Sequence, residues 1–297
     1  MVALAPPPGE SLRRAARWLA DHAGAESNTC VGLARLGLRV AWVSCLGHDA
    51  AGDRILDALE AERVDTTWVR RDALRPTGVM LKDPAAGVRY YRTGSAASAM
   101  GPDLLDGVPA PRARAVLVTG VTALIGAAPH AAGLALLEAG QGLRIVDPNL
   151  RHGLWGSDRR AALVLPFIER CTLLLSGASE LEEILTGTGG AGGSGESGGW
   201  DAAEALARRA TAYGPREVVV RGAAAIGAVA DGVGTELPIA RGAAVDPIGA
   251  GDAFNAGYIA ARLRGDGVEA ALGAGITCGT AVTTVMSDTN GFPRTID

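Results

Sequence analysis

The residue types best suited to chemistry lie late in the chain, in Gly249-Ala250-Gly251-Asp252. An extended segment from Val245 leads into them, and an apolar helical pattern follows as far as Ala260. If a helix begins here, the N–H groups of residues 249–252 converge at the positive end of its dipole and form a site for an anion. Asp252 could then accept the proton of a hydroxyl that attacks a bound phosphoryl group. The alternative is a helix start at which Asp and Gly act only as caps.

Composition restricts the partners that this protein can have. The 28 Lys and Arg against 32 Asp and Glu give a formal net charge of −4, so no basic field is present that would attract nucleic acid. No uncharged apolar run reaches the roughly 20 residues that a membrane span requires, and the first residues lack the pattern of a secretion signal. The four cysteines are far apart and lack metal-ligand spacing, which is typical of buried thiols in a reducing compartment. We therefore expect a cytoplasmic protein that binds neither nucleic acid nor membranes.

Helical patterns and apolar strand-like runs alternate along much of the chain. Such alternation indicates an α/β fold with a doubly wound, mostly parallel sheet and helices on both of its faces. The length of 297 residues suits one such domain, spanning 1–297. The predicted strands are Leu38 to Cys45, Ala115 to Thr119, Leu143 to Asp147, Thr172 to Ser176 and Glu217 to Val220, and the predicted helices are Ser27 to Gly37, Asp53 to Arg63, Ala131 to Gly140 and Asp201 to Tyr213.

Two segments depart from this alternation. Gly78 to Asp83 and Val88 to Thr93 are short strand-like runs joined by a turn, which predicts an antiparallel hairpin. We expect it to belong to a small β-sheet lid formed by about residues 1–24 and 76–98. Free strand edges in such a lid often pair between subunits, so we expect a homo-oligomer. The glycine-rich run 187–199 has too little apolar surface to order itself and is predicted to be a flexible loop; a phosphate-binding loop is the alternative.

The stretch from Val245 to Ala260 closely resembles the C-terminal signature of the PfkB, or ribokinase-like, family of carbohydrate kinases. Further matches to family motifs are Gly24 to Asn28, Leu36-Gly37 and Leu46 to Gly52, and the resemblance extends from Met1 to about Pro293. It implies a Rossmann-like domain with a β-sheet lid that uses ATP and Mg²⁺ to phosphorylate a primary hydroxyl of a sugar. The roles it implies are a base at Asp252, an anion hole at Gly249, Ala250 and Gly251, and sugar contacts at Gly24, Ala25 and Asn28.

The hairpin strand offers a criterion for the substrate. Side chains alternate along a strand, so Tyr90 and Arg92 lie on one face while Tyr91 and Thr93 lie on the other. An arginine beside a tyrosine can bind a carboxylate through its planar fork of donors, which favours an acidic sugar; a solvated arginine is the alternative. The string YYRTGSAAS is very similar to a segment of 2-keto-3-deoxygluconate kinases, which implies that Tyr90 and Arg92 contact the keto-acid.

Three further segments resemble the same subfamily. The segment from Asp147 to Trp155 implies that Asn149 and Arg151 line the site between sugar and phosphates, and a polar strand end also fits the rule that ligands bind beyond the carboxyl ends of parallel strands. Ser179 to Glu182 resembles an NxxE motif in which Glu182 helps to organise Mg²⁺. Ser287 to Pro293 resembles a closing loop, which implies a sugar contact for Asp288.

The nucleotide side departs from the family pattern. Residues 221–225 resemble a Lys-x-Gly-x-x-Gly segment, but Val220 takes the Lys position and Ala225 that of the second Gly. If that position requires a positive φ, Ala225 would cost about 1 kcal/mol or more. The resemblance implies nucleotide contacts for Asn149, Arg151, Arg221, Gly222, Ala225, Gly249, Gly251, Ile276 and Gly279.

The family also has a strand ahead of the counterpart of Met1-Val-Ala-Leu. We therefore expect the central sheet to lack that strand unless a neighbouring element fills its slot, which would leave ladder groups unpaired. A shortened sequence would have the same effect. Three hypotheses follow: a kinase for 2-keto-3-deoxygluconate, a ribokinase- or fructokinase-like kinase for a neutral sugar, and an inactive sugar- or nucleotide-binding regulatory relative. The retained Asp252 argues against the third, because an inactive protein has no chemical reason to keep it.

Overall fold

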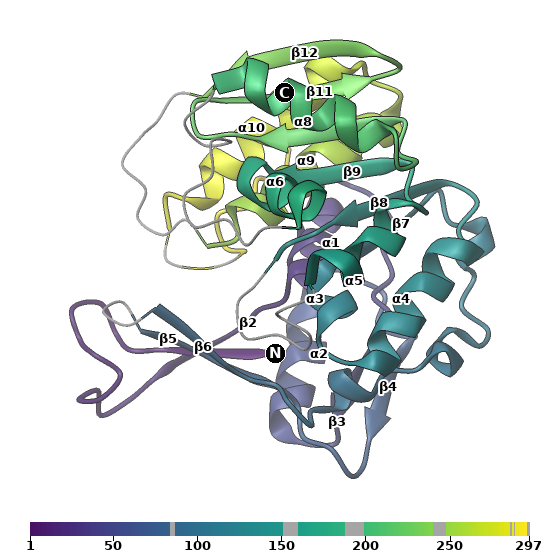
Figure 1. Ribbon diagram of the computed structural model, residues 1–297. Helices are drawn as coiled ribbons and strands as arrows, with labels where there is room; N and C mark the ends of the chain where they lie inside the picture. Colours follow the sequence, from purple (N-terminus) through teal and green to yellow (C-terminus); the bar gives the residue numbers. More distant parts are fainter. Residues whose placement is uncertain are drawn as a thin grey trace.

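The computed structural model describes residues 1–83, 87–150, 160–187, 199–239, 248–285, 287 and 289–295. Its largest sheet has six strands in the order β12-β11-β10-β9-β8-β7 (Figure 1). The neighbours from β7 to β10 run parallel, and β11 and β12 extend the sheet antiparallel. The strand bounds are β7 (Ala115–Thr119), β8 (Leu143–Asp147), β9 (Leu173–Gly177), β10 (Glu217–Arg221), β11 (Ala225–Ala230) and β12 (Val233–Pro238).

Helices cover both faces of this sheet, as the alternating sequence pattern predicted (Figure 1). Leu174 packs into the core on one face, whereas Leu173 and Leu175 pack into the core on the other, because successive side chains of a strand point to opposite sides. The first face carries α3 (Gly120–Leu124), α4 (Ala127–Ala139), α5 (Arg160–Ile168), α6 (Ala178–Thr186) and α8 (Gly199–Thr211), and the second carries α9 (Ala250–Arg264) and α10 (Val268–Val282). None of the helices in the described ranges is long and apolar enough to cross a bilayer.

A second sheet, with four strands in the order β2-β1-β5-β6, projects from the body of the molecule (Figure 1). The predicted hairpin is confirmed, since β5 and β6 pair antiparallel with Val79 opposite Tyr91. One face of this sheet packs through Val2 and Leu4 on the same core as Ile55 and Leu59. The elements concerned are β1 (Val2–Ala5), β2 (Leu19–His22), β5 (Val79–Asp83), β6 (Gly87–Tyr91), α1 (Ala25–Arg35) and α2 (Ala50–Ala61).

The strand predicted for residues 38–45 is wrong in its extent. Only Ser44–Gly47 forms a strand, β3, which pairs in parallel with β4 (Val69–Asp72) in a separate two-stranded sheet. Before it, Ala41 makes a single isolated bridge to Asp65. Val40 and Trp42 of this run pack against the core that contains Ile55 and Leu59, and residues 38–43 also line a cavity.

That cavity lies between β7 and the β3–β4 sheet and has a volume of about 1070 Å³. Residues 116–118 of β7 and residues 44–46 of β3 both line it. Within the described chain, the outer edge of β7 has no strand paired to it. The slot expected from the sequence is thus filled by none of the described elements.

Candidate active site

Helix α9 begins immediately after Gly249, whose φ of 88° lies in the left-handed region that glycine adopts without strain. The backbone bond from the Ala253 N–H to the Gly249 carbonyl, 2.9 Å long, closes the first turn. The N–H groups of Ala250 and Gly251 precede that bond, so the helical ladder leaves them available. The N-cap residue, Gly249, has no side chain with which to cap this end of α9. Together with the helix dipole, these groups make the amino end of α9 suited to hold an anion.

Asp252 lies in the first turn of α9 and is only 8% exposed. Its Oδ2 accepts a hydrogen bond of 2.8 Å from Nδ2 of Asn28, which lies in α1, 224 positions earlier in the chain. The Thr29 hydroxyl also donates to the Asp252 carbonyl at 3.4 Å, so α1 holds the first turn of α9 at two points. The buried Oδ1 of Asn28 has no partner among the described residues and is left as an acceptor. The structure thus brings together the predicted base and one of the predicted sugar contacts.

Behind the amino end of α9, three polar side chains form a closed ring. Arg221, at the end of β10, donates from Nη2 to both carboxylate oxygens of Asp147, at 3.2 and 3.1 Å, and from Nη1 to Oδ1 of Asn255 at 2.6 Å. Asn255 closes the ring by donating to Oδ2 of Asp147 at 2.6 Å. Burial disfavours the charged form of Arg221, but the negative charges of Asp147 and Glu180 outweigh it and raise its pKa above the ordinary value. Arg221 is therefore a permanent cation at the carboxyl edge of the sheet.

Asn149 lies just beyond β8 in an unusual conformation, with a φ of 38°. Its backbone N–H donates to Oδ1 of Asp147 at 3.0 Å, which fixes this turn against the strand end. Its own Oδ1 is buried and has no partner among the described residues. A strained, buried amide at the carboxyl edge of a parallel sheet is a candidate ligand-binding group.

The acidic residues of α6 have different surroundings. Glu180 accepts hydrogen bonds from the N–H groups of Leu150 at 2.9 Å and Gly177 at 3.0 Å, and so joins the ends of β8 and β9. Glu183 is paired with Arg160. Glu182, the predicted magnesium residue, lies in the same helix and is half-buried.

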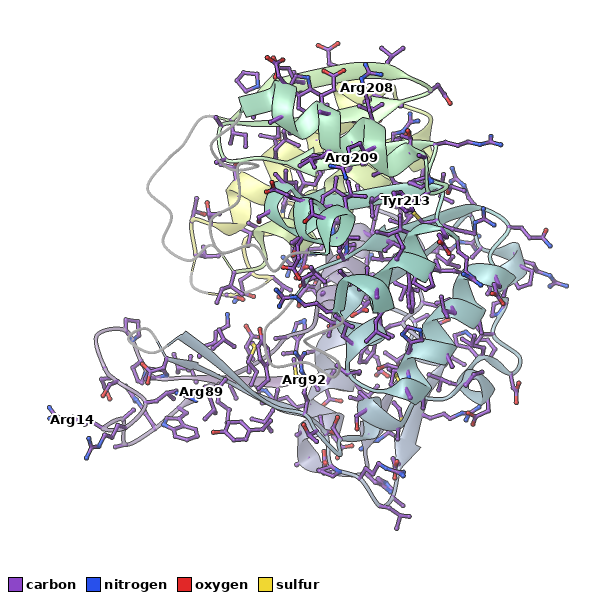
Figure 2. The ribbon with its side chains drawn as sticks, viewed as in Figure 1. Arg14, Arg89, Arg92, Arg208, Arg209 and Tyr213 are labelled. Atoms are coloured by element: carbon purple, nitrogen blue, oxygen red, sulfur yellow. The ribbon has the colours of Figure 1, made fainter. Side chains whose placement is uncertain are left out.

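Tyr90 and Arg92 lie on one face of the β6 segment, as predicted. The Arg92 guanidinium carbon is 4.2 Å from the centroid of the Tyr90 ring, whereas Tyr91 is 60% exposed. Figure 2 shows Arg92 at the inner end of the four-stranded sheet, near the body of the molecule, and Arg89 further out along it. Arg92 thus lies where the projecting sheet meets the main domain.

Of the predicted nucleotide contacts, Gly279 lies beside the start of α9. A Cβ added at Gly279 of α10 would lie 3.1 Å from the carbonyl oxygen of Ala250, so the absence of a side chain lets α10 approach closely. Ile276, one turn earlier, packs in the core shared by α9 and the sheet. Gly222 donates its N–H to the carbonyl of Ala225 at 3.0 Å. Ala225 begins β11 without a positive φ, so the backbone strain considered for this position is absent.

Other residues of interest fall outside these observations. Arg151 and Asp288 lie outside the described residues, as does most of the predicted loop 187–199. Gly24 and Ala25 form the start of α1, at the same end as Asn28.

Asn255 was missed in the sequence, although its position three residues after Asp252 in a helical pattern places it on the same side of the helix.

Known proteins that are similar to this chain over most of its length are carbohydrate kinases. A model described as pfkB family carbohydrate kinase matches residues 2–295. A 2-dehydro-3-deoxygluconokinase from Thermoproteus tenax is 31% identical over 293 residues, covering 95% of this chain and 85% of that protein. A fructokinase from Klebsiella pneumoniae is 29% identical over 291 residues, covering 93% and 90%. The crystal structure of a PfkB protein from Polaromonas sp. JS666 superposes with a TM-score of 0.82 at 31% identity, covering 99% of this chain and 95% of that one. Because the match spans the sequence as well as the fold, the chain belongs to the pfkB family of carbohydrate kinases and is a sugar kinase.

Proposed function

We propose that this kinase transfers the γ-phosphoryl group of ATP to the terminal primary hydroxyl of 2-keto-3-deoxygluconate. The observation that carries the proposal is the placement of the Asp252 carboxylate, hydrogen-bonded to Asn28, in the first turn of α9, beside the positive end of that helix. The resemblance to the Thermoproteus tenax enzyme supports the choice of sugar.

In this mechanism, Asp252 accepts the proton of the sugar hydroxyl as its oxygen attacks the γ-phosphorus. The bond between that phosphorus and the bridging oxygen of the nucleotide breaks, and ADP leaves with the bonding electrons. The N–H groups of Gly249, Ala250 and Gly251 donate to the transferring phosphoryl oxygens, where negative charge must be held. Asn28 keeps the carboxylate oriented through its 2.8 Å hydrogen bond.

Magnesium fits the donors present if the nucleotide supplies much of its coordination. Within the described ranges, no group of three or more His, Cys, Asp or Glu side chains could hold a metal on its own. Mg²⁺ commonly retains several waters and is held by one or two carboxylates together with substrate phosphates, and it would neutralise phosphate charge. Glu182 is the carboxylate that we assign to this role.

The remaining assignments divide between the two substrates. On the sugar side, we assign the carboxylate of the keto-acid to Arg92 and Tyr90, and sugar hydroxyls to Asn28 and the start of α1. The four-stranded sheet would act as the lid. Arg151 and Asp288 keep their predicted roles outside the described residues.

On the nucleotide side, we assign contacts to Asn149, Gly222, Ala225, Ile276 and Gly279. Pairing of lid edges would make the protein a homo-oligomer, which light scattering can test.

The decisive experiment compares kcat/KM for 2-keto-3-deoxygluconate, fructose and ribose in the wild type and two variants. Arg92→Gln should lower kcat/KM for the keto-acid by about tenfold or more, because a charge-assisted bond to its carboxylate is lost, and should leave the neutral sugars unchanged. Arg89→Gln, an exposed change on β6, the strand that Arg92 directly follows, is the matched control. Faster wild-type turnover of fructose or ribose would refute the acid assignment.

A neutral-sugar kinase is the second candidate, and the similarity to the Klebsiella pneumoniae fructokinase favours it. Under that hypothesis, Arg92→Gln leaves the preferred substrate unaffected. An inactive regulatory relative is distinguished by calorimetry, since a chain that binds no ATP in the presence of Mg²⁺ would not be a working kinase.

A further inference from the structure

The ring of Arg221, Asp147 and Asn255 lies where three parts of the proposed site meet. Arg221 comes from the end of β10, Asp147 from the end of β8, and Asn255 from the second turn of α9. The Asp147 side chain is fully buried, and that of Asn255 is 1% exposed. Water therefore cannot replace a lost hydrogen-bond partner of either side chain, and loss of one member of the ring leaves buried polar groups unsatisfied.

The ring is hydrogen-bonded to two groups that face the nucleotide in the proposed reaction. On one side, Oδ1 of Asp147 receives the Asn149 N–H and so holds that residue at its φ of 38°. On the other side, Nη1 of Arg221 lies 3.5 Å from the carbonyl of Gly251, and Asn255 belongs to the same helix. The first turn of α9 is thus braced against the sheet edge.

The charge of Arg221 also suits a site that receives phosphates. The carboxylates of Asp147, Glu180 and Asp252 all act on this guanidinium. Without a cation among them, these three negative charges would oppose a polyphosphate. The guanidinium is already engaged by Asp147 and Asn255, and its side chain is 16% exposed. It is therefore better placed to arrange the site than to grip the nucleotide.

We propose that Arg221 is a positioning residue for the nucleotide phosphates, acting through Asp147 on Asn149 and through Asn255 on the first turn of α9. This role rests on the proposed function, because it requires that nucleotide phosphates bind at the amino end of α9. It differs from the direct nucleotide contact that the sequence suggested for Arg221, and the two roles lead to different outcomes in a double variant.

A matched control exists at the opposite end of the same two elements. Arg262, near the end of α9, donates to both oxygens of Glu217, at the start of β10, at 3.0 and 2.7 Å. The helix and the strand are thus tied by an arginine at each end. Arg262→Met breaks a similar ion pair in the same pair of elements, but away from the proposed site.

The experiment measures binding of a non-hydrolysable ATP analogue with Mg²⁺ by calorimetry, together with thermal unfolding of each variant. Arg221→Met should bind about tenfold more weakly, as when other supporting partners of a ligand site are removed. Arg262→Met should bind like the wild type despite a comparable loss of stability. Arg221→Met/Asp147→Asn should bind at least about threefold more tightly than Arg221→Met, because the uncompensated carboxylate is gone and an acceptor for the Asn149 N–H remains. Arg221→Lys, which keeps the charge but not the fork, covers the case in which Arg221→Met does not fold, and should also bind more weakly.

Other outcomes overturn the inference in recognisable ways. Wild-type affinity in Arg221→Met or Arg221→Lys, or equal weakening in Arg262→Met, would show that the ring does not position the site. A double variant as weak as Arg221→Met would indicate direct contact between Arg221 and the nucleotide. If the wild type itself binds no nucleotide, the proposed function fails first and this role fails with it.

Discussion

Replacing Asp252 by Asn tests the proposed chemistry most directly. The change keeps the shape of a side chain that is only 8% exposed, and it leaves an oxygen able to accept the hydrogen bond from Asn28. Folding should therefore change little, by about 1 kcal/mol or less in the free energy of unfolding. What is lost is the carboxylate that accepts the hydroxyl proton.

The expected size follows from that single loss. Removing a general base lowers kcat by about 10² to 10⁴, which corresponds to about 3 to 5 kcal/mol in the activation free energy. KM for ATP should stay within roughly threefold of the wild type, since the helix amides remain in place. The assay couples ADP release to a dehydrogenase and uses saturating sugar and ATP.

Asp266→Asn is the control, because this exposed aspartate lies just beyond the far end of α9 and should leave turnover unchanged. Thermal unfolding of both variants establishes that the folded fraction is comparable. Turnover of Asp252→Asn within about fivefold of the wild type would refute the role of Asp252 as the base.

Three further outcomes follow from packing and charge. Gly279→Val should raise KM for ATP by about tenfold, because the new side chain pushes on the Ala250 carbonyl at the amino end of α9; Gly273→Val, on the same helix with nothing near its Cβ, should not. Ala132→Leu should raise the free energy of unfolding by up to about 2 kcal/mol in urea titrations, because it fills part of the cavity beside β7. Ala207→Leu, in a packed core position, should lower it instead, and equal effects would contradict the reasoning. The pKa of Asp21 is lowered from 3.8 to about 2. Burial raises this pKa, but the hydrogen bonds and the charge of His22 lower it by more. The resulting stabilisation of the folded state is present above the ordinary pKa and is lost as the pH falls from about 4 to 2. Asp21→Asn should therefore make the urea midpoint depend less on pH in this range. An unchanged dependence would contradict this reasoning.

The sequence predicts the elements of this fold well where local pattern decides. Residues 115–119 and 143–147 form strands with the predicted bounds, because short and largely apolar runs of this length suit a strand buried on both faces. The helix after Gly249 was also predicted, since the glycines and the apolar pattern that follows them are local signals.

Contacts between distant segments were not predictable in the same way. The family resemblance implied a nucleotide contact for Arg221, but nothing in the sequence indicated that its guanidinium is bound by Asp147 and Asn255. That ring depends on the order of β8, β9 and β10 in the sheet and on the packing of α9 behind them. A single sequence contains no signal for such an order, and Asn255 was not among the predicted site residues.

The unpaired outer edge of β7 affects how this protein should fail under heat. Its main-chain donors and acceptors have no strand opposite them within the described chain, and apolar side chains surround them. When the β3–β4 side moves away, that edge becomes a template to which an extended segment of a second molecule can add. Irreversible loss of activity on heating would then be a bimolecular process, and the rate of inactivation should rise with protein concentration.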